Sequence, residues 1–365
     1  MDACDEAAGA RFDLQGVVLG RYPNEIDPEA AVVACRSAVE RFPAVARFRY
    51  ELGRALEAKG EHVEAGEAYG QAAAGGHWLG LTALGSLHET GRGVPQDARQ
   101  AVALYEQAAA KGEPLAMNSL GRAWRDGRGV PQRDRERAID WFLQAAARGH
   151  SFAYNNLGTM LAAEGRDAEA LALFRASAEG GDIYGFNNLG WAYENGIGVA
   201  PDLEKAISWY EKAAAGGQPM APINLGLIHR DGRPGVPSDL GKAAFWFAEA
   251  ARRGAGWGNV HLAALYADGR LPGGADPVLA AELLARAAGD GGAAGEAARQ
   301  ELERLPRSAL VAAAQHGLAE IGLDPGPVDG RMGERTRAAI RSFAEGREPP
   351  FPELLAALAT AGRER

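Results

Sequence analysis

Few residues of this chain stand in patterns that could carry out a reaction. None of the seven histidines has the spacing of a metal site, and the sequence contains neither an HExxH motif nor a GxSxG turn. Two cysteines alone are too few to build a zinc site. Carboxylates such as Glu106 and Glu211 stand singly on helix faces expected to be solvated, so no acid–base pair is indicated. We therefore expect a protein that is not an enzyme, with no catalytic residue, no metal and no cofactor.

Three asparagines are better candidates for a binding role. Asn156, Asn188 and Asn224 each directly precede a leucine–glycine pair. A side-chain amide both donates and accepts hydrogen bonds, so a row of amides suits the backbone or carboxylate of a bound peptide. The same amides would equally suit bonds between neighbouring structural units. The row is incomplete, because Ala83 and Ser119 take the place of asparagine earlier in the chain.

The leucine–glycine pairs form an internal repeat. Their glycines are spaced 32 to 37 residues apart, and Leu262-Ala263 continues the series in altered form. A period of about 35 residues is typical of stacked supersecondary units, each packing only on its neighbours. The pattern therefore predicts a repeat protein rather than one globular core. The glycines of the series are Gly53, Gly85, Gly121, Gly158, Gly190 and Gly226.

Each period predicts two helices. The first carries the leucine–glycine pair and ends at a glycine, and the second opens at an aspartate and ends in alanines and glycine. Aspartate suits an N-cap because its carboxylate accepts the free amide hydrogens of the first turn, and a terminal glycine takes a left-handed conformation without steric cost. Alanines and the mid-helix glycine leave room for the neighbouring helix, while leucines and aromatic residues fill the remaining volume. The expected N-cap residues are Asp97, Asp134, Asp167, Asp202, Asp239 and Asp276.

This pattern resembles the Sel-one-like repeat, a relative of the tetratricopeptide repeat. The fullest copy spans residues 188–210, and the resemblance covers residues 27–290, opening with a half-repeat at Pro28–Phe42. It implies an all-α fold, namely a right-handed superhelical α-solenoid of helix-turn-helix repeats, and we expect a capping helix at Glu296–Leu305. In tetratricopeptide solenoids the residue before the leucine–glycine pair points into a concave groove. The resemblance therefore implies that the three asparagines face a groove for a protein or peptide partner, with bonds between repeats as the other interpretation.

The sequence changes character after residue 305. The stretch Ala309–Phe343, followed by a predicted helix at Pro352–Ala359, resembles the small three-helix peptidoglycan-binding domain of bacterial envelope proteins. The resemblance implies peptidoglycan as a ligand. Ala344 stands where the family has glutamine, so a domain that binds peptidoglycan and one kept only as a structural cap both fit the sequence. The residues that match the family's turn are Asp329, Gly330, Arg331, Gly333 and Thr336.

Charge and hydropathy argue against nucleic-acid binding and against a transmembrane segment. The net charge of −9, without a basic stripe, argues against nucleic acid. No run is long and apolar enough for a transmembrane segment. The first residues lack the basic and apolar parts of a signal peptide, so such a segment is either absent or trimmed before residue 1.

The two cysteines give information about the cellular compartment of the protein. Cys4 lies in the N-terminal arm and Cys35 on the first predicted helix. Together with the envelope-type domain at the other end of the chain, they favour a disulfide that pins the arm to the half-repeat. The alternative is an exposed Cys4 and a buried, inert Cys35.

These observations predict three parts: an N-terminal arm (1–26), a repeat solenoid with its capping helix (27–305) and a peptidoglycan-binding-like domain (306–365). We expect a noncatalytic adaptor of the bacterial cell envelope, periplasmic after removal of a signal peptide. Its groove would bind a protein or peptide while its C-terminal domain tethers it to peptidoglycan. A cytoplasmic interaction adaptor with a vestigial C-terminal domain and an accessory subunit of a peptidoglycan-processing enzyme remain as alternatives.

Overall fold

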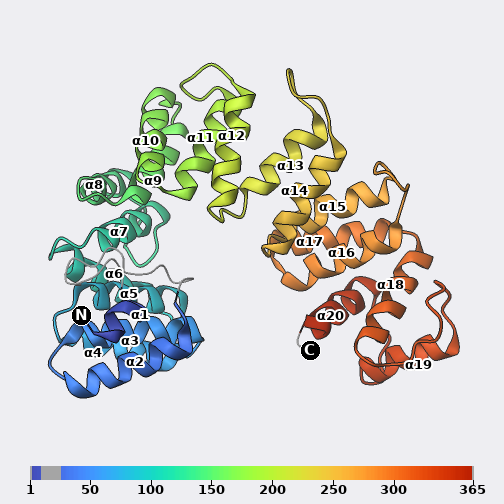
Figure 1. The fold of residues 1–365 in the computed structure, drawn as a ribbon, viewed down its shortest axis with the longest axis horizontal. Coiled ribbons are helices and arrows are strands. Elements are labelled where there is room, and N and C mark those ends of the chain that lie inside the picture. The colour runs from blue at the N-terminus through green and yellow to red at the C-terminus, as the bar shows by residue number, and fades with distance from the viewer. Residues whose placement is uncertain (1, 10–25, 364–365) are drawn as a thin grey trace. The chain divides into compact units, whose positions relative to one another are not determined.

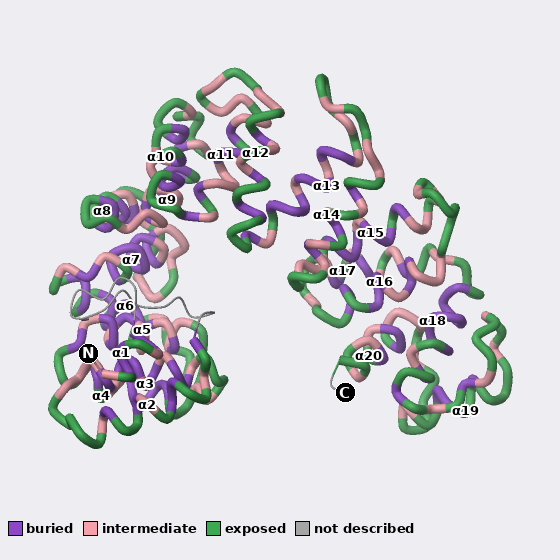
Figure 2. The backbone as a smooth tube through the Cα atoms, in the orientation of Figure 1, coloured by how far each residue is buried: buried purple, intermediate pink, exposed green. Residues whose placement is uncertain are grey.

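The computed structural model describes residues 2–9 and 26–363, and the regular elements in these ranges are α-helices in consecutive pairs (Figure 1). The chain divides into two compact units, residues 1–182 and 183–365. In each repeat we call the helix with the leucine–glycine pair the A helix and the next one the B helix. Along the helices, buried positions alternate with exposed ones, as expected of elements that pack on one side (Figure 2).

Residues 2–9 and 26–182 of the first unit form a short N-terminal helix, one unpaired helix and four A–B pairs. Its helices are α1 (Ala3–Ala8), α2 (Pro28–Arg41), α3 (Ala46–Lys59), α4 (His62–Ala74), α5 (Trp78–Thr90), α6 (Ala98–Ala109), α7 (Pro114–Asp126), α8 (Arg135–Ala146), α9 (Ser151–Ala162) and α10 (Asp167–Glu179). The unpaired helix α2 is the half-repeat that the sequence predicts.

The second unit contains three A–B pairs followed by four further helices. Its helices are α11 (Ile183–Asn195), α12 (Leu203–Ala215), α13 (Ala221–Asp231), α14 (Leu240–Arg252), α15 (Gly256–Ala267), α16 (Pro277–Asp290), α17 (Gly292–Arg304), α18 (Arg307–Glu320), α19 (Glu334–Phe343) and α20 (Phe351–Arg363). The expected capping helix is α17, which begins four residues earlier than predicted. The expected helix at Pro352–Ala359 is α20, which extends to Arg363.

The aspartate caps are confirmed at five of the six predicted positions. Asp97, Asp134, Asp202, Asp239 and Asp276 each accept a hydrogen bond from a backbone N–H in the first turn of a B helix.

The prediction of a cap at Asp167 is wrong. Arg166 is the N-cap residue of α10 and makes no capping hydrogen bond, and Asp167 is the first helical residue. This repeat, like the α3–α4 repeat, lacks the glycine-rich loop, so the chain passes from Gly165 through Arg166 alone into the helix, and the aspartate falls one position after the cap. Asp167 still places a negative charge in the first turn, where the helix dipole favours it.

The glycine of each leucine–glycine pair lies against an aromatic ring from the B helix of the same repeat. A Cβ atom built on any of these glycines would lie 2.4–2.7 Å from the ring, which is too close for any side chain. The ring stands eight residues after the N-cap, and each is almost completely buried. The pairs are Gly53–Tyr69, Gly85–Tyr105, Gly121–Phe142, Gly158–Phe174, Gly190–Tyr210 and Gly226–Phe247.

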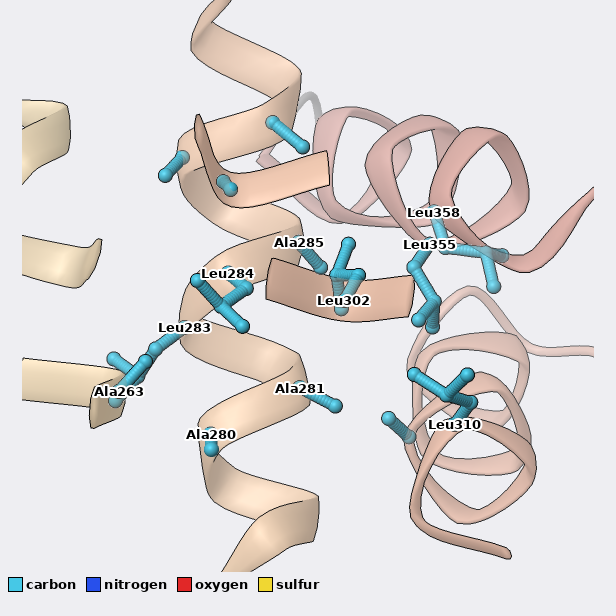
Figure 3. Packing of buried hydrophobic residues seen from close by; sticks show 14 of the residues in the cluster. Ala263, Ala280, Ala281, Leu283, Leu284, Ala285, Leu302, Leu310, Leu355 and Leu358 are labelled. Carbon is cyan, nitrogen blue, oxygen red and sulfur yellow. The ribbon is translucent and has the colours of Figure 1, made fainter. Parts of the chain in front are cut away.

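The altered seventh copy follows the same steric rule. Leu284 occupies the ring position eight residues after Asp276, and Ala263 stands in place of the glycine. Both side chains are buried in one core cluster (Figure 3). A leucine leaves more room than a ring at this contact, so a methyl group on the A helix is tolerated.

Whether the ring is tyrosine or phenylalanine correlates with the residue type at one position of the A helix. Where the ring is tyrosine, the residue four after the glycine is glutamate, and the hydroxyl donates to it at 2.8–2.9 Å. Where the ring is phenylalanine, that residue is Arg125, Ala162 or Arg230. Burial raises the pKa of each of these tyrosines and the adjacent glutamate raises it further, so the hydroxyl keeps its proton. The bonded pairs are Tyr69–Glu57, Tyr105–Glu89 and Tyr210–Glu194.

The same glutamates tie each repeat to the next. Glu57 pairs with Arg92 at 2.9 Å, Glu89 with Arg122 at 3.2 Å and Glu194 with Arg233 at 3.3 Å. Each arginine belongs to the following repeat. One carboxylate therefore accepts a hydrogen bond within its repeat and forms an ion pair to its neighbour, which sets the stacking register.

The C-terminal helices share a core with the last repeats. Leu310 of α18 and Leu355 of α20 pack in the same buried cluster as Ala281 and Ala285 of α16 (Figure 3). The side chain of Glu282 on α16 also bonds His316 on α18, with 2.7 Å between Oε1 and Nδ1. The core is continuous across residue 306, and the division into a solenoid at 27–305 and a domain at 306–365 stays a proposal.

Replacing Gly190 by alanine tests the glycine–ring contact. The added methyl would meet the Tyr210 ring at 2.7 Å. Overpacking costs about 1–3 kcal/mol, while alanine regains about 0.5–1 kcal/mol of helix propensity, so we expect a net loss of about 1–2 kcal/mol in the free energy of unfolding. Urea denaturation followed by circular dichroism measures it.

Gly70, a helical glycine of α4 with no atom within 4 Å of a built Cβ, gives the control. Gly70→Ala is expected to be neutral or stabilising. Adding Tyr210→Leu to Gly190→Ala imitates the Leu284–Ala263 pair and should cost less than the two single changes added together. A Gly190→Ala protein as stable as the wild type would contradict the packing argument.

Candidate binding sites in the two units

Two of the three predicted asparagines bond to an asparagine on the preceding A helix. Asn156 Nδ2 on α9 donates to Asn118 Oδ1 on α7 at 2.9 Å, and Asn224 Nδ2 on α13 donates to Asn187 Oδ1 on α11 at 3.1 Å. Asn188 accepts from Asn187 at 3.4 Å. These bonds agree with the interpretation that the amides link neighbouring repeats. A role for Asn156, Asn188 and Asn224 in holding a peptide stays a prediction.

The acceptors of these bonds escaped the sequence analysis. Asn118 and Asn187 stand three residues before their glycines, whereas the donors stand two residues before theirs. The doublet Asn187-Asn188 is the signal that could have shown both positions. The bond joins different positions of adjacent repeats, so aligning equivalent positions does not reveal it.

A hollow of about 510 Å³ lies on the A-helix side of the first unit. Part of its wall comes from three positions of successive A helices: the residues six before, two before and one after the glycine. We call these positions the groove face. In the hollow they are occupied by Arg54, Leu79, Ala83, Ser86, Leu115, Ser119 and Arg122.

Charged groups in the hollow are largely paired with one another. Arg92 and Arg122 form the ion pairs with Glu57 and Glu89, and Arg54 donates to the carbonyl of Ala8 at 2.6 Å. The hollow thus offers polar groups already held in place around an apolar floor of leucines. This combination suits an extended peptide, whose backbone needs hydrogen bonds and whose side chains need apolar surface.

The turn before α19 is organised by one buried side chain, Gln315 of α18. Its Oε1 accepts from the backbone N–H groups of Asp329 at 3.1 Å and Gly330 at 3.0 Å. Its Nε2 lies 3.0 Å from the Arg331 carbonyl, 3.1 Å from Thr336 Oγ1 and 3.2 Å from Asp329 Oδ1. Four of the five predicted turn residues therefore meet around a residue that was recognised as part of the domain but not as part of the site.

The remaining geometry of the turn explains its glycines and its charge. Gly330 has a φ of +70°, and a Cβ there would lie 2.7 Å from the Ser308 carbonyl oxygen. Gly333 is the N-cap residue of α19 and has open space around it. The backbone N–H of Arg331 and the amide of Gln315 lower the pKa of Asp329. The turn is a well-satisfied structural unit, and its contact with peptidoglycan stays a prediction.

A cavity of about 440 Å³ lies beside this turn, where α19 meets the first residues of α18 and α20. Its charged lining residues are the exposed Arg307 and Arg337 and also Glu348, which is paired with Arg341 at 2.7 Å, and Met332, Ile340 and Phe351 supply apolar wall. The Arg307 guanidinium lies 6.0 Å from the centre of the Phe351 ring. Because Glu348 is paired outside this group, the two arginines suit a ligand with a carboxylate and an apolar face. Three separated segments build the cavity, so no local sequence pattern indicates it.

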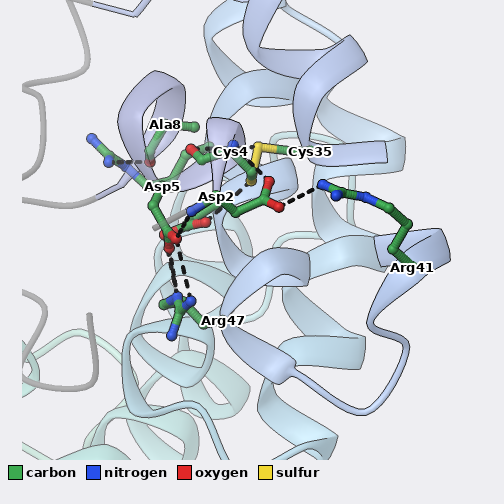
Figure 4. Close-up of a disulfide and its surroundings, with 9 residues drawn as sticks. Asp2, Cys4, Asp5, Ala8, Cys35, Arg41 and Arg47 are labelled. Atoms are coloured by element: carbon green, nitrogen blue, oxygen red, sulfur yellow. Dashed lines mark hydrogen bonds and ion pairs between the residues drawn. A yellow bond between two sulfur atoms is a disulfide. The ribbon is translucent and has the colours of Figure 1, made fainter. Parts of the chain in front are cut away.

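A disulfide joins Cys4 on α1 to Cys35 on α2, with an S–S distance of 2.06 Å (Figure 4). Both residues are completely buried. Arg47 strengthens the attachment of α1, because its Nε lies 2.7 Å from the Asp5 carboxylate. Cys4, Cys35 and Glu51 are the one group of three potential metal ligands among residues 2–9 and 26–363, but the two sulfurs are bonded to each other.

Stacked helical repeats define the class of this protein, and comparison with known proteins gives the family. The Sel1 repeat family matches residues 78–113, 114–150, 187–218, 219–254 and 259–291. The chain is a Sel1 repeat protein. The pairs α3–α4 and α9–α10, which lack the glycine-rich loop, lie outside these matches. Residues 307–344 match the family described as "Putative peptidoglycan binding domain".

A solved structure shows the same fold. A Sel1 repeat protein from Oxalobacter formigenes is 27% identical, with a TM-score of 0.55 over 66% of this chain and 96% of its own. The protective antigen c5321 of uropathogenic Escherichia coli, which displays an SLR fold, is 25% identical, with a TM-score of 0.49 over 86% of this chain and 72% of its own. A comparison with curated proteins found no significant match. No helix within the described ranges has the length and hydropathy to cross a membrane.

The disulfide is expected to contribute substantially to the stability of the first unit. It closes a loop with a sequence separation of 31 residues, which corresponds to about 3–4 kcal/mol of lost chain entropy in the unfolded state. Urea denaturation with and without reductant measures this difference. A protein with Cys4→Ser and Cys35→Ser should unfold at a lower urea concentration than the wild type, and reductant should not change that concentration. Wild-type protein that unfolds at the same urea concentration in both conditions would refute the expectation.

Gln315→Ala tests the organisation of the turn. The change removes the partner of two backbone N–H groups and leaves Thr336 and the Arg331 carbonyl without the amide. Leaving several buried polar groups unsatisfied costs about 2–4 kcal/mol, so we expect the second unit to unfold at lower urea. Gln107→Ala, at an exposed residue that bonds only within its own helix, serves as control and should change little. Equal effects of the two changes would contradict the role of Gln315.

Proposed function

We propose that this chain is a noncatalytic adaptor of the bacterial cell envelope. Its repeats bind a protein or peptide, and its C-terminal domain attaches it to peptidoglycan. The observation that carries the proposal is the match of residues 307–344 to the peptidoglycan-binding family, on a turn whose hydrogen bonds are complete. The Sel1 repeats supply the scaffold to which that domain is joined.

The chemistry of the C-terminal cavity supports attachment to the cell wall. Peptidoglycan stem peptides carry carboxylates, and arginine binds carboxylates through paired N–H groups. Arg307 and Arg337 line the cavity, and Phe351 offers an apolar surface in it. Because the core of this domain is continuous with α16, a ligand held here is held rigidly to the last repeats.

The hollow of the first unit supports the adaptor role. It lies on the same side of three successive A helices and combines fixed polar groups with apolar floor. We place the protein or peptide partner there, and Asn156 occupies the corresponding position of a later repeat in the same unit. Joining two modest binding surfaces raises the local concentration of the second ligand without either contact needing to be tight.

The disulfide supports a periplasmic location over a cytoplasmic one. Structural disulfides persist in oxidising compartments and are rare in the reducing cytoplasm. Here the bridge is fully buried and secures α1 to the half-repeat, which marks it as structural.

Cosedimentation of the full chain with purified peptidoglycan sacculi tests the proposal. We expect wild-type protein in the pellet and at least about tenfold weaker binding for Arg337→Glu, because the change puts a like charge against the stem-peptide carboxylate. Arg99→Glu, at an exposed arginine of α6, is the charge-matched control and should pellet like the wild type. Wild-type protein that stays in solution, or Arg337→Glu that pellets equally well, would refute the tether.

A further inference from the structure

The groove face of the second unit has a different chemistry from the hollow of the first. Six residues before each glycine, or before Ala263, stand Tyr184, Met220 and Trp257, which are 43%, 43% and 36% exposed. One residue after Gly190 stands Trp191, which is 37% exposed. Large apolar side chains exposed at equivalent positions of three successive repeats form a row rather than a scatter.

Uncharged polar groups lie within this row. The residues two before the glycine position are Asn188, Asn224 and His261. On α11, Asn188 lies between Tyr184 and Trp191 at spacings of four and three residues, which puts all three on one helix face. On α15, the His261 ring stacks on Trp257 with 5.8 Å between ring centres. Burial lowers the pKa of His261, so its ring is neutral at pH 7.

None of the nine groove-face residues of α11, α13 and α15 carries a charge. The charged residues of these helices are Glu194, Arg230 and Asp231, all in the last turn. Glu194 bonds Tyr210 and Arg233, and Arg230 pairs with Asp231 at 2.6 Å. The first unit differs, since its groove face includes Arg54 and Arg122. The remaining groove-face residues of the second unit are Leu227 and Ala264.

We propose that the groove face of the second unit binds an uncharged glycan chain. One face of a pyranose ring carries C–H groups and packs on an aromatic ring, while its edges carry hydroxyl groups that need donors and acceptors. Tyr184, Trp191 and Trp257 provide the rings. The side-chain amides of Asn188 and Asn224 provide groups that both donate and accept.

Charge and position favour a glycan over a peptide as the occupant. A peptide ligand usually meets charged groups that read its termini or side chains, as in the first unit, whereas this face has none. The face also belongs to the unit that contains the peptidoglycan-matching domain, and its helix α15 shares a core cluster with α18, α19 and α20. A polymer held at one of these surfaces is presented to the other at high local concentration.

The inference rests on the proposed function only in naming peptidoglycan as the source of the glycan. A neutral oligosaccharide without stem peptides therefore tests it separately from the wall tether. The probe is chitohexaose, a chain of six β-1,4-linked N-acetylglucosamine units, titrated into the full-length protein by isothermal calorimetry.

We expect saturable binding by the wild type and a loss of about tenfold or more for Trp191→Ala and for Trp257→Ala. Trp191→Phe keeps a ring and should lose less than Trp191→Ala. Phe245→Ala, at a 61% exposed aromatic residue of α14 that is not on the groove face, is the matched control and should bind like the wild type. Arg337→Glu should also bind normally, because the C-terminal cavity takes no part.

Several outcomes overturn the inference. Absence of binding by a folded wild type does so, as does equal weakening by Trp191→Ala and Phe245→Ala. Loss of binding in Arg337→Glu would place the glycan in the C-terminal cavity instead. If calorimetry detected binding of an aliphatic hexapeptide but not of chitohexaose, the groove face of the second unit would be assigned to a peptide. Normal chitohexaose binding by a protein that fails to pellet with sacculi would refute the tether and leave this inference standing.

Discussion

The contact between a helical glycine and a buried ring sets the geometry of every repeat. Because no Cβ separates the helices at the glycine, the A helix closes directly on the tyrosine or phenylalanine of its B helix. In the repeats whose ring is tyrosine, the residue four after the glycine is a glutamate that accepts the tyrosine hydroxyl. That glutamate also pairs with an arginine of the next repeat. Close approach within a repeat and register between repeats therefore depend on one pair of positions. The candidate binding surfaces include residues of the same A helices, and the rings Tyr69 and Tyr105 reach the hollow of the first unit.

Much of the fold could be predicted from the sequence because its signals are local. The repeat period, five aspartate caps and the helix-ending glycines each depend on residues close together in the chain. The exception at Asp167 shows the limit, since the presence of a cap depends on loop length as well as on residue type. The pairing of each glycine with a ring was predicted only in part. The sequence showed that glycine leaves room, but not that the space is filled by a ring eight residues after the cap.

The candidate sites were harder to predict because they depend on contacts between distant segments. The asparagines were found as a row, yet the bond from Asn156 to Asn118 joins different positions of two repeats. Gln315 lies within the stretch that resembles the family, but its role as the centre of the turn appears only when Asp329 and Thr336 fold back onto it. A structural cap was one interpretation of the C-terminal domain, but the residues of the core shared by α16 and α20 were not predicted. The pattern of alanines and leucines in this core does not indicate which residues they contact.

The repeats also show where this architecture can vary. A residue that faces the ring is confined by packing, because a single methyl group there requires the ring to become leucine, as in the Ala263–Leu284 pair. The residues two before and one after the glycine are not confined by this contact, although Arg122 and Asn224 at these positions also link neighbouring repeats. At these positions the first unit has Arg54, Ser119, Arg122 and Asn156, and the second unit has Asn188, Trp191 and Asn224. One scaffold thus presents two surfaces of different chemistry, because the ring fixes the glycine position and leaves the residue types at its neighbours open.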